Sequence, residues 1–163
     1  MIITGDSEDA IKQVKSFIRT YFKLKDLGLL KYFLGVEVAR SKADISINQQ
    51  KYTLDILNEA WLSGVKLVKF YMQRNLKLSP TDEELLKDPT CYQWLVGKLI
   101  YIIITRPKIT FTVNTLSRFM QTPRRPHLDA VHCLLRYLKG SPGQGLLFPS
   151  KNDMGLIGYY DAD

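Results

Sequence analysis

Residues 88–104 read DPTCYQWLVGKLIYIII, and their apolar side chains recur at the spacing of one face of an α-helix. Asp88 supplies an N-cap, and Pro89 suits the first helical position, where its missing N–H costs no hydrogen bond. The apolar stripe consists of Tyr92, Leu95, Val96, Leu99 and Ile103. The stretch therefore predicts an amphipathic helix that packs one face against a core.

Two further helices are expected downstream. The first begins near Pro107, and its apolar face consists of Ile109, Val113, Leu116 and Met120. The second begins at Pro126 and ends at Gly140, and its apolar face consists of Leu128, Val131, Leu135 and Leu138. Residues 89–140 are thus predicted to form a three-helix segment.

The rest of the chain mixes strands with single helices. We expect a short strand at residues 2–4 and then a helix that begins after Gly5-Asp6-Ser7. Residues 32–38 and 45–47 alternate like the strands of a hairpin, and residues 52–61 suggest a short amphipathic helix. Residues 145–148 and 156–160 read as two terminal strands without a partner. The predicted fold class is α+β: strands plus helix, a three-helix segment, and two strands.

Basic residues concentrate in the three-helix segment. The 163-residue chain has 23 Lys and Arg against 16 Asp and Glu, a net charge of +7. Residues 89–140 contain eight basic residues and one acidic residue, so this segment alone has a net charge of +7. Such a block is typical of proteins that bind a polyanion, although basic globular domains without nucleic acid are also common.

Several other kinds of site are excluded. There is no Walker A phosphate loop and no GxSxG motif, and Cys91 and Cys133 alone form neither a zinc site nor a disulfide framework. His127 and His132 are five residues apart and do not share a helical face as a metal pair would. The apolar run 99–104 is too short to cross a bilayer, and the N-terminus is not typical of a secretory leader. We expect an intracellular protein without a membrane or small-molecule partner.

The carboxylates at the end of the sequence are candidates for a metal site. Asp161 and Asp163 follow the expected strand 156–160, and their spacing puts both on one face. Two-metal chemistry needs further carboxylates, for which Asp153 is a candidate. A solvated acidic terminus accounts for these residues more simply.

Several short motifs, in one order along the chain, resemble the reverse transcriptases of copia-type retrotransposons. The motifs are residues 27–40 (LGLLKYFLGVEVAR), 51–57 (KYTLDIL), 95–101 (LVGKLIY), 105–107 (TRP), 117–120 (SRFM), 126–127 (PH) and 135–140 (LRYLKG). The resemblance implies a palm remnant with a primer-grip-like hairpin at 1–62, a linker at 63–88, and a helical thumb-like segment at 89–140. Residues 141–163 would be a connection and the first strand of a truncated ribonuclease H domain.

The resemblance also implies which residues contact an RNA–DNA or DNA duplex. Phe33, Leu34, Gly35 and Glu37 match the primer grip, and the thumb helix would place Gln93, Gly97 and Lys98 along the minor groove. There are structural alternatives to these roles: Phe33 and Leu34 could be core residues, and Gly97 could serve helix packing. The candidate phosphate ligands are Arg106, Arg124, Arg125, Arg136 and Lys139. Four or five phosphate contacts would give a slope of roughly −4 for log K against log salt.

Polymerase activity is not expected. The Tyr-Val-Asp-Asp turn that binds Mg²⁺ in the full-length family would lie just before Met1, so this chain is expected to bind no metal or other cofactor. Asp161 matches the first ribonuclease H metal-binding acid. The sequence departs from the family's usual pattern at residues 70–72, at Trp94 and at Lys108.

The resemblance thus implies a catalytically inactive fragment of an RNA-directed DNA polymerase that retains duplex affinity. The alternatives are the product of a degenerate reading frame without a selected role and, less favoured, a metal-dependent nuclease remnant. Similar truncated reading frames occur in plant genomes, so a copy in a plant mitochondrial genome is one expected source.

Overall fold

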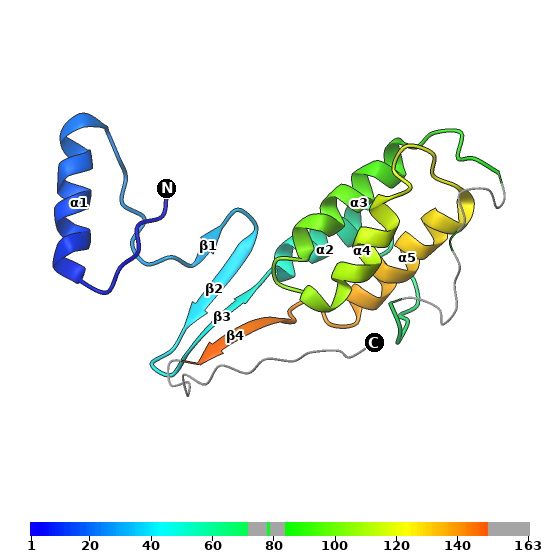
Figure 1. Ribbon diagram of the computed structural model, residues 1–163. Helices are drawn as coiled ribbons and strands as arrows, with labels where there is room; N and C mark the ends of the chain where they lie inside the picture. The colour runs from blue at the N-terminus through cyan, green and yellow to red at the C-terminus, as the bar shows by residue number, and fades with distance from the viewer. Residues whose placement is uncertain (72–77, 79–83, 150–163) are drawn as a thin grey trace, which may run out of the picture.

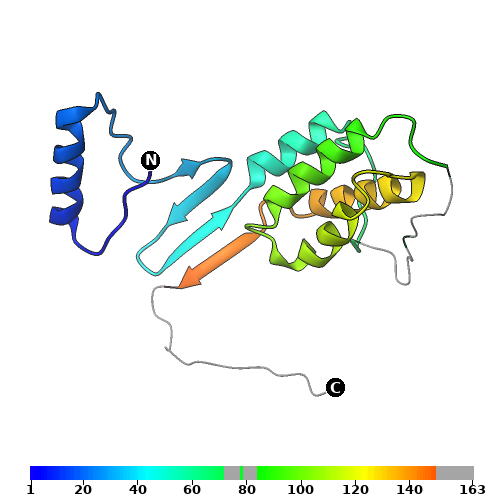
Figure 2. The same ribbon diagram turned by 45° about the horizontal axis from the view of Figure 1, so that its top comes forward.

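The computed structural model describes residues 1–71, 78 and 84–149. Within these ranges it contains a small four-stranded sheet, five α-helices and one 3₁₀ turn (Figure 1). Helices α2 to α5 form a bundle at one end, the sheet lies beside it, and helix α1 lies beyond the sheet, as Figures 1 and 2 both show. The predicted mixture of helices and strands is confirmed at this level.

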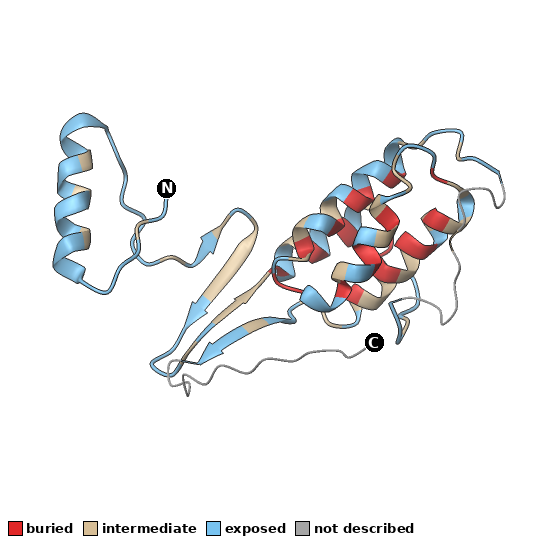
Figure 3. Ribbon diagram, in the orientation of Figure 1, coloured by how far each residue is buried: buried red, intermediate tan, exposed pale blue. Residues whose placement is uncertain are grey.

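The core of the protein lies inside the helical bundle. The bundle consists of α2 (Gln50–Glu59), α3 (Thr90–Ile102), α4 (Thr110–Ser117) and α5 (Arg125–Lys139), and the 3₁₀ turn Pro107–Ile109 leads directly into α4. The largest fully buried side chains come from all four helices and that turn, and include Ile56, Tyr92, Leu95, Leu99, Ile109, Leu116, Leu134 and Leu138. Figure 3 shows the buried residues gathered in the bundle. The predicted helices at 88–104, after Pro107 and near Pro126 are therefore confirmed.

The start of α3 follows the sequence pattern closely. The Asp88 carboxylate accepts a hydrogen bond from the Thr90 N–H at 2.9 Å. Hydrogen bonds from the Thr90 side chain and, second, from this N–H lower the pKa of Asp88. Pro89 is the N-cap residue and Thr90 the first helical residue. A carboxylate at a helix N-terminus satisfies an otherwise unpaired donor and faces the positive end of the helix dipole.

The sheet has the strand order β1-β2-β3-β4, with every pair antiparallel. Its strands are β1 (Tyr32–Phe33), β2 (Val36–Arg40), β3 (Asp44–Asn48) and β4 (Gly145–Pro149). The expected hairpin between residues 32–38 and 45–47 is present as β2 and β3. The Ser41 hydroxyl closes its turn by accepting hydrogen bonds from the N–H groups of Ala43 and Asp44.

Two predictions about the strands of this sheet are wrong. Residues 32–38 are not one strand, because a tight turn at Leu34 and Gly35 splits them into β1 and β2. Residues 145–148 were expected to lack a partner, but β4 pairs with β3 along its whole length. Gly145 permits this pairing, because a Cβ there would collide with the carbonyl oxygen of Ile47. The expected strand 156–160 lies outside the described residues.

Residues 1–31, which precede β1, contribute no buried residue. Residues 2–4 are not a strand, and α1 (Glu8–Tyr21) begins after its N-cap Ser7 as predicted. Asp26 forms ion pairs with Lys15 at 2.9 Å and Arg19 at 3.8 Å, which hold the following segment against the helix. The hydrogen bond from Lys15 is the main cause of a lowered pKa at Asp26. These contacts are exposed, so they fix geometry more than they add stability.

The predicted segment boundaries do not coincide with breaks in the packing. The sheet joins β4, from the expected connection, to three strands of the expected palm remnant. Helix α2, from that same remnant, packs in the core with α3 and α5. Arg106 helps to tie the parts together, because its guanidinium donates hydrogen bonds to the carbonyl oxygens of Ser141 and Pro142, where the chain leaves α5 for β4.

Candidate nucleic-acid interface

The tip of the first hairpin is a two-residue turn in a strained conformation. Leu34 has φ 47° and Gly35 has φ 80°, while Phe33 and Val36 pair on either side. Two successive positive φ angles in a two-residue hairpin loop are typical of a type I′ turn, whose first position favours Asn or Gly. Leu34 is instead a leucine with 69% of its surface exposed. Leu34 is therefore not a core residue, whereas Phe33 is half-buried.

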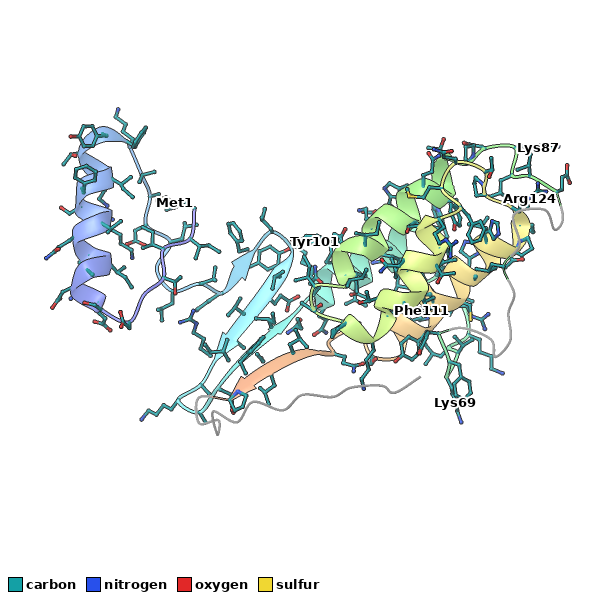
Figure 4. The ribbon with its side chains drawn as sticks, in the orientation of Figure 1. Met1, Lys69, Lys87, Tyr101, Phe111 and Arg124 are labelled. Atoms are coloured by element: carbon teal, nitrogen blue, oxygen red, sulfur yellow. The ribbon has the colours of Figure 1, made fainter. Side chains whose placement is uncertain are left out.

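The hairpin tip rests on two tyrosines from the helical bundle. Tyr101, near the end of α3, donates a hydrogen bond from its hydroxyl to the Leu34 carbonyl oxygen. A Cβ on Gly35 would contact the rings of Tyr101 and Tyr52 at 3.4 and 3.5 Å. The two rings meet edge to face, with their centroids 5.2 Å apart. Figure 4 shows Tyr101 at the junction between the hairpin and the bundle.

Tyr52 also links this junction to a lysine on α3. Burial, reinforced by Tyr101 and Glu59, raises the pKa of Tyr52 above its ordinary value. The Lys98 ammonium lies 5.6 Å from the centroid of the Tyr52 ring and 4.9 Å from that of the Trp94 ring. It also pairs with the Glu59 carboxylate at 3.0 Å. Lys98 is thus a positioned cation between two aromatic rings.

The exposed face of α3 continues from this junction. Gly97 is exposed, and a Cβ at this position would meet nothing within 4 Å. The alternative that Gly97 serves helix packing is therefore wrong. Gln93, one turn earlier, donates from Nε2 to the Met120 carbonyl at 2.8 Å. We call Leu34, Gly35, Gln93, Trp94, Gly97, Lys98 and Tyr101 together the α3 surface.

Glu37 lies near this surface but serves the fold. Its Oε1 accepts a hydrogen bond from the Lys51 N–H at 2.8 Å, in the first turn of α2. Gln49, the N-cap residue of α2, makes no side-chain capping bond, so the strand supplies the missing acceptor. Glu37 therefore fixes β2 against the bundle.

The five candidate phosphate ligands are not gathered on one face. Arg106 is buried, with 5% of its surface exposed. Arg136 donates from Nε to the Lys66 carbonyl at 2.7 Å, and Lys139 donates from Nζ to the carbonyls of Ser63 and Val65. Arg136 and Lys139 thus hold the chain that follows α2.

The other two candidates lie at the start of α5. Arg125 is exposed and pairs with Asp129 at 3.2 Å. Arg124 is half-buried, and its N–H donates to His127 Nδ1 at 3.0 Å. The candidate phosphate ligands therefore lie apart from the α3 surface. Four of them are in α5 or at its N-cap, and Arg106 is in the interior.

Sequence reasoning missed Tyr52 and Tyr101 as parts of the site. Tyr101 lies eight residues after Gln93, and Gln93, Gly97 and Tyr101 recur every four residues on the exposed side of α3. This four-residue spacing could have indicated from the sequence that Tyr101 belongs to the site. The contact of Tyr52 with the hairpin depends on how α2 packs against α3, which no local pattern reveals.

No metal site is found in the part of the chain that the structure describes. In residues 1–71, 78 and 84–149, no group of three or more His, Cys, Asp or Glu side chains is arranged to hold an ion. The candidate acid Asp161 lies outside these ranges, as do Asp153 and Asp163. Within the same ranges, no helix combines the length and apolar character needed to cross a bilayer.

A comparison with protein families gives a match to the N-terminal part of the chain. The family described as "Reverse transcriptase (RNA-dependent DNA polymerase)" matches residues 1–73, which include the hairpin of the α3 surface. No solved structure matches the chain.

Curated relatives extend the match to the whole chain. The Retrovirus-related Pol polyprotein from transposon RE1 of Arabidopsis thaliana is 37% identical over all 163 residues, which span 11% of that protein. The corresponding polyprotein from transposon TNT 1-94 of Nicotiana tabacum is 34% identical and is spanned to 13%. An uncharacterized mitochondrial protein of Arabidopsis thaliana is 28% identical and is spanned to 68%. The resemblance to copia-type retrotransposon reverse transcriptases is thus confirmed: the chain is similar to a short stretch of each of these Pol polyproteins.

Proposed function

We propose that this chain binds a template–primer duplex through the α3 surface and holds the duplex without catalysing a reaction on it. The carrying observation is the contact of Tyr101 with the hairpin tip, which makes the tip and the exposed face of α3 one continuous surface. The family match supports a nucleic-acid partner in general, because the matching family is that of an RNA-dependent DNA polymerase.

The shape of the α3 surface suits an RNA–DNA hybrid. Duplexes with A-form character have a wide, shallow minor groove that displays 2′-hydroxyl groups. The absence of a side chain at Gly97 lets the backbone of α3 approach sugar atoms closely. The exposed Gln93 side chain and the partly exposed Trp94 ring flank that position, and they offer polar and apolar contact to sugars and base edges.

The charge of this surface is modest. Lys98 is its one cation by definition, and the pair with Glu59 holds the ammonium beside Trp94. The net charge of +7 attracts any polyanion at long range, whereas contact within the α3 surface depends more on shape than on ion pairs. Binding is therefore proposed to depend less on salt than a grip by the whole basic segment would.

Catalysis forms no part of this proposal. Two-metal phosphoryl transfer requires clustered carboxylates, and the donor sets in the described residues do not provide such a cluster. A product without a selected role remains the alternative, and it predicts no preference for a hybrid duplex over other polyanions.

Fluorescence provides the test. Trp61 is 91% exposed, so a Trp61→Phe variant leaves Trp94 as the only tryptophan. An RNA–DNA hybrid is expected to change the Trp94 emission with a saturable dependence on concentration, and heparin at matched charge is expected to change it far less. Equal responses to the hybrid and to heparin, or no response to the hybrid, would contradict the proposed function.

A further inference from the structure

Helix α1 has an exposed apolar stripe along one side. Val14, Phe17 and Tyr21 follow one another at three- and four-residue steps on one face, and Phe17 and Tyr21 are 64% and 70% exposed. Ala10, one turn earlier on the same face, is also exposed. The rings of Phe17 and Tyr21 lie with their centroids 5.2 Å apart. We call Ala10, Val14, Phe17 and Tyr21 together the outer stripe.

A neighbouring side of α1 faces the rest of the chain. Ile11, Lys15 and Ile18 are half-buried and line a hollow together with residues 1–5 and 24–33. No residue of the outer stripe lines that hollow. Figures 1 and 2 show α1 beyond the sheet and away from the bundle, and Figure 3 shows no buried residue on it. Within the described part of the chain, the outer stripe therefore stays uncovered.

The spacing of the outer stripe fits a second helix. Isolated helices of about 12–15 residues are marginal in water, so a 14-residue helix such as α1 normally depends on the packing of its apolar face. The steps of four, three and four residues from Ala10 to Tyr21 are those of a coiled-coil contact, in which each apolar side chain inserts between residues of the facing helix. The outer stripe is thus suited to a helical partner.

The charges around α1 indicate which helix this partner is. Asp6 and Glu8 lie at the start of α1, whereas Lys23 and Lys25 lie just beyond its end. Within the described residues, none of these four side chains forms an ion pair. A second α1 in the antiparallel direction would bring the acidic start of each helix to the basic end of the other. A parallel copy would instead bring like charges together.

We propose that two copies of this chain associate through antiparallel α1 helices related by a two-fold axis. In the register that places Val14 of each copy opposite Phe17 of the other, Ala10 lies opposite Tyr21. Small and large side chains then face each other across the contact, as close packing requires. A 14-residue helix is only about 21 Å long, so the contact is small and the dimer is expected to form at micromolar to millimolar concentrations. The inference does not depend on the α3 surface.

Sedimentation velocity of the full chain at increasing concentration tests the association. An equilibrium between monomer and dimer is expected, and Phe17→Gln is expected to raise its Kd by about tenfold. Phe17 lies outside the core, so this variant keeps the fold of the bundle. Phe111→Gln is the matched control, because Phe111 is at least as exposed and lies on α4. A chain that stays monomeric at millimolar concentration, a dimer that persists unchanged in Phe17→Gln, or equal losses in both variants would overturn the proposal.

Charge reversal tests the antiparallel direction. The proposed register places Glu8 of one copy level with Lys23 of the other. Glu8→Lys and Lys23→Glu are each expected to weaken the dimer by about tenfold, because each brings like charges together at both ends of the contact. The double variant restores opposite charges, so its Kd is expected to return to within about threefold of that of the unmodified chain. Single variants without effect, or a double variant no tighter than the single ones, would contradict the antiparallel dimer.

Discussion

Replacing Gly97 by leucine separates stability from binding. Gly97 lies inside the 13-residue helix α3, and a Cβ there meets nothing within 4 Å. A leucine side chain is therefore accommodated without strain in the free protein. Because glycine in a helix interior is less favourable than leucine by about 0.5–1 kcal/mol, Gly97→Leu is expected to raise stability by that amount. The melting temperature would rise by about 1–4 °C.

The same substitution should weaken duplex binding. The new side chain projects from the exposed face of α3, where the proposed duplex approaches the helix backbone. Fluorescence anisotropy with a labelled RNA–DNA hybrid is expected to show at least a tenfold rise in Kd, which corresponds to about 1.4 kcal/mol. Because the variant is the more stable protein, unfolding cannot account for the loss.

Asn114→Leu is the matched control. Asn114 is exposed on α4, outside the α3 surface, and receives the same side chain. Its Kd is expected to stay within twofold of the unmodified chain. Unchanged affinity in Gly97→Leu would refute the reasoning, as would equal losses in both variants.

Further predictions follow from other parts of the structure. Leu34→Asn should raise stability by about 1 kcal/mol in chemical denaturation, because asparagine tolerates the positive φ that leucine does not; a loss of stability would contradict the turn assignment. A plot of log K against log salt should have a slope of about −1, from Lys98 alone, instead of the slope of about −4 expected from the five candidate phosphate ligands. A chain that starts at Leu30 should unfold with an unchanged helical transition by circular dichroism, because no residue before Gln49 is buried; loss of that transition would contradict the placement of the core. Burial, reinforced by Arg125 and opposed by Asp129, lowers the pKa of His132 below 6.5, so the unfolded chain binds more protons and stability should fall as pH drops through 6.5 towards the folded pKa. His132→Gln should flatten that part of the pH profile of the melting temperature.

The helices were predictable because their signals are local. The apolar spacing from Tyr92 to Ile103 and the Asp88-Pro89 start place α3 to within two residues of its observed bounds. The prediction of a single strand at 32–38 was wrong because the local signal for a turn is missing there. The composition is β-rich, and the first residue of the turn is leucine, not the asparagine or glycine that such a turn favours.

Long-range packing was not predictable from the sequence alone. The pairing of β4 with β3 joins residues about a hundred positions apart, and it depends on the route that Arg106 fixes after α5. Among the candidate site residues, charge pointed equally to Arg106 and to Lys98, although one is buried and the other lies beside two rings. A charge pattern indicates the class of partner, but it does not reveal which cations are exposed to that partner and which form contacts within the fold.

The central claim is that the hairpin tip and the exposed face of α3 form one surface that contacts a duplex. Amide chemical-shift mapping during titration with an RNA–DNA hybrid tests it most directly. The claim predicts that the amides of Leu34, Gly35, Gln93, Gly97 and Tyr101 shift together with one midpoint. Shifts confined to α5 around Arg136 and Lys139, with the α3 surface unchanged, would contradict it.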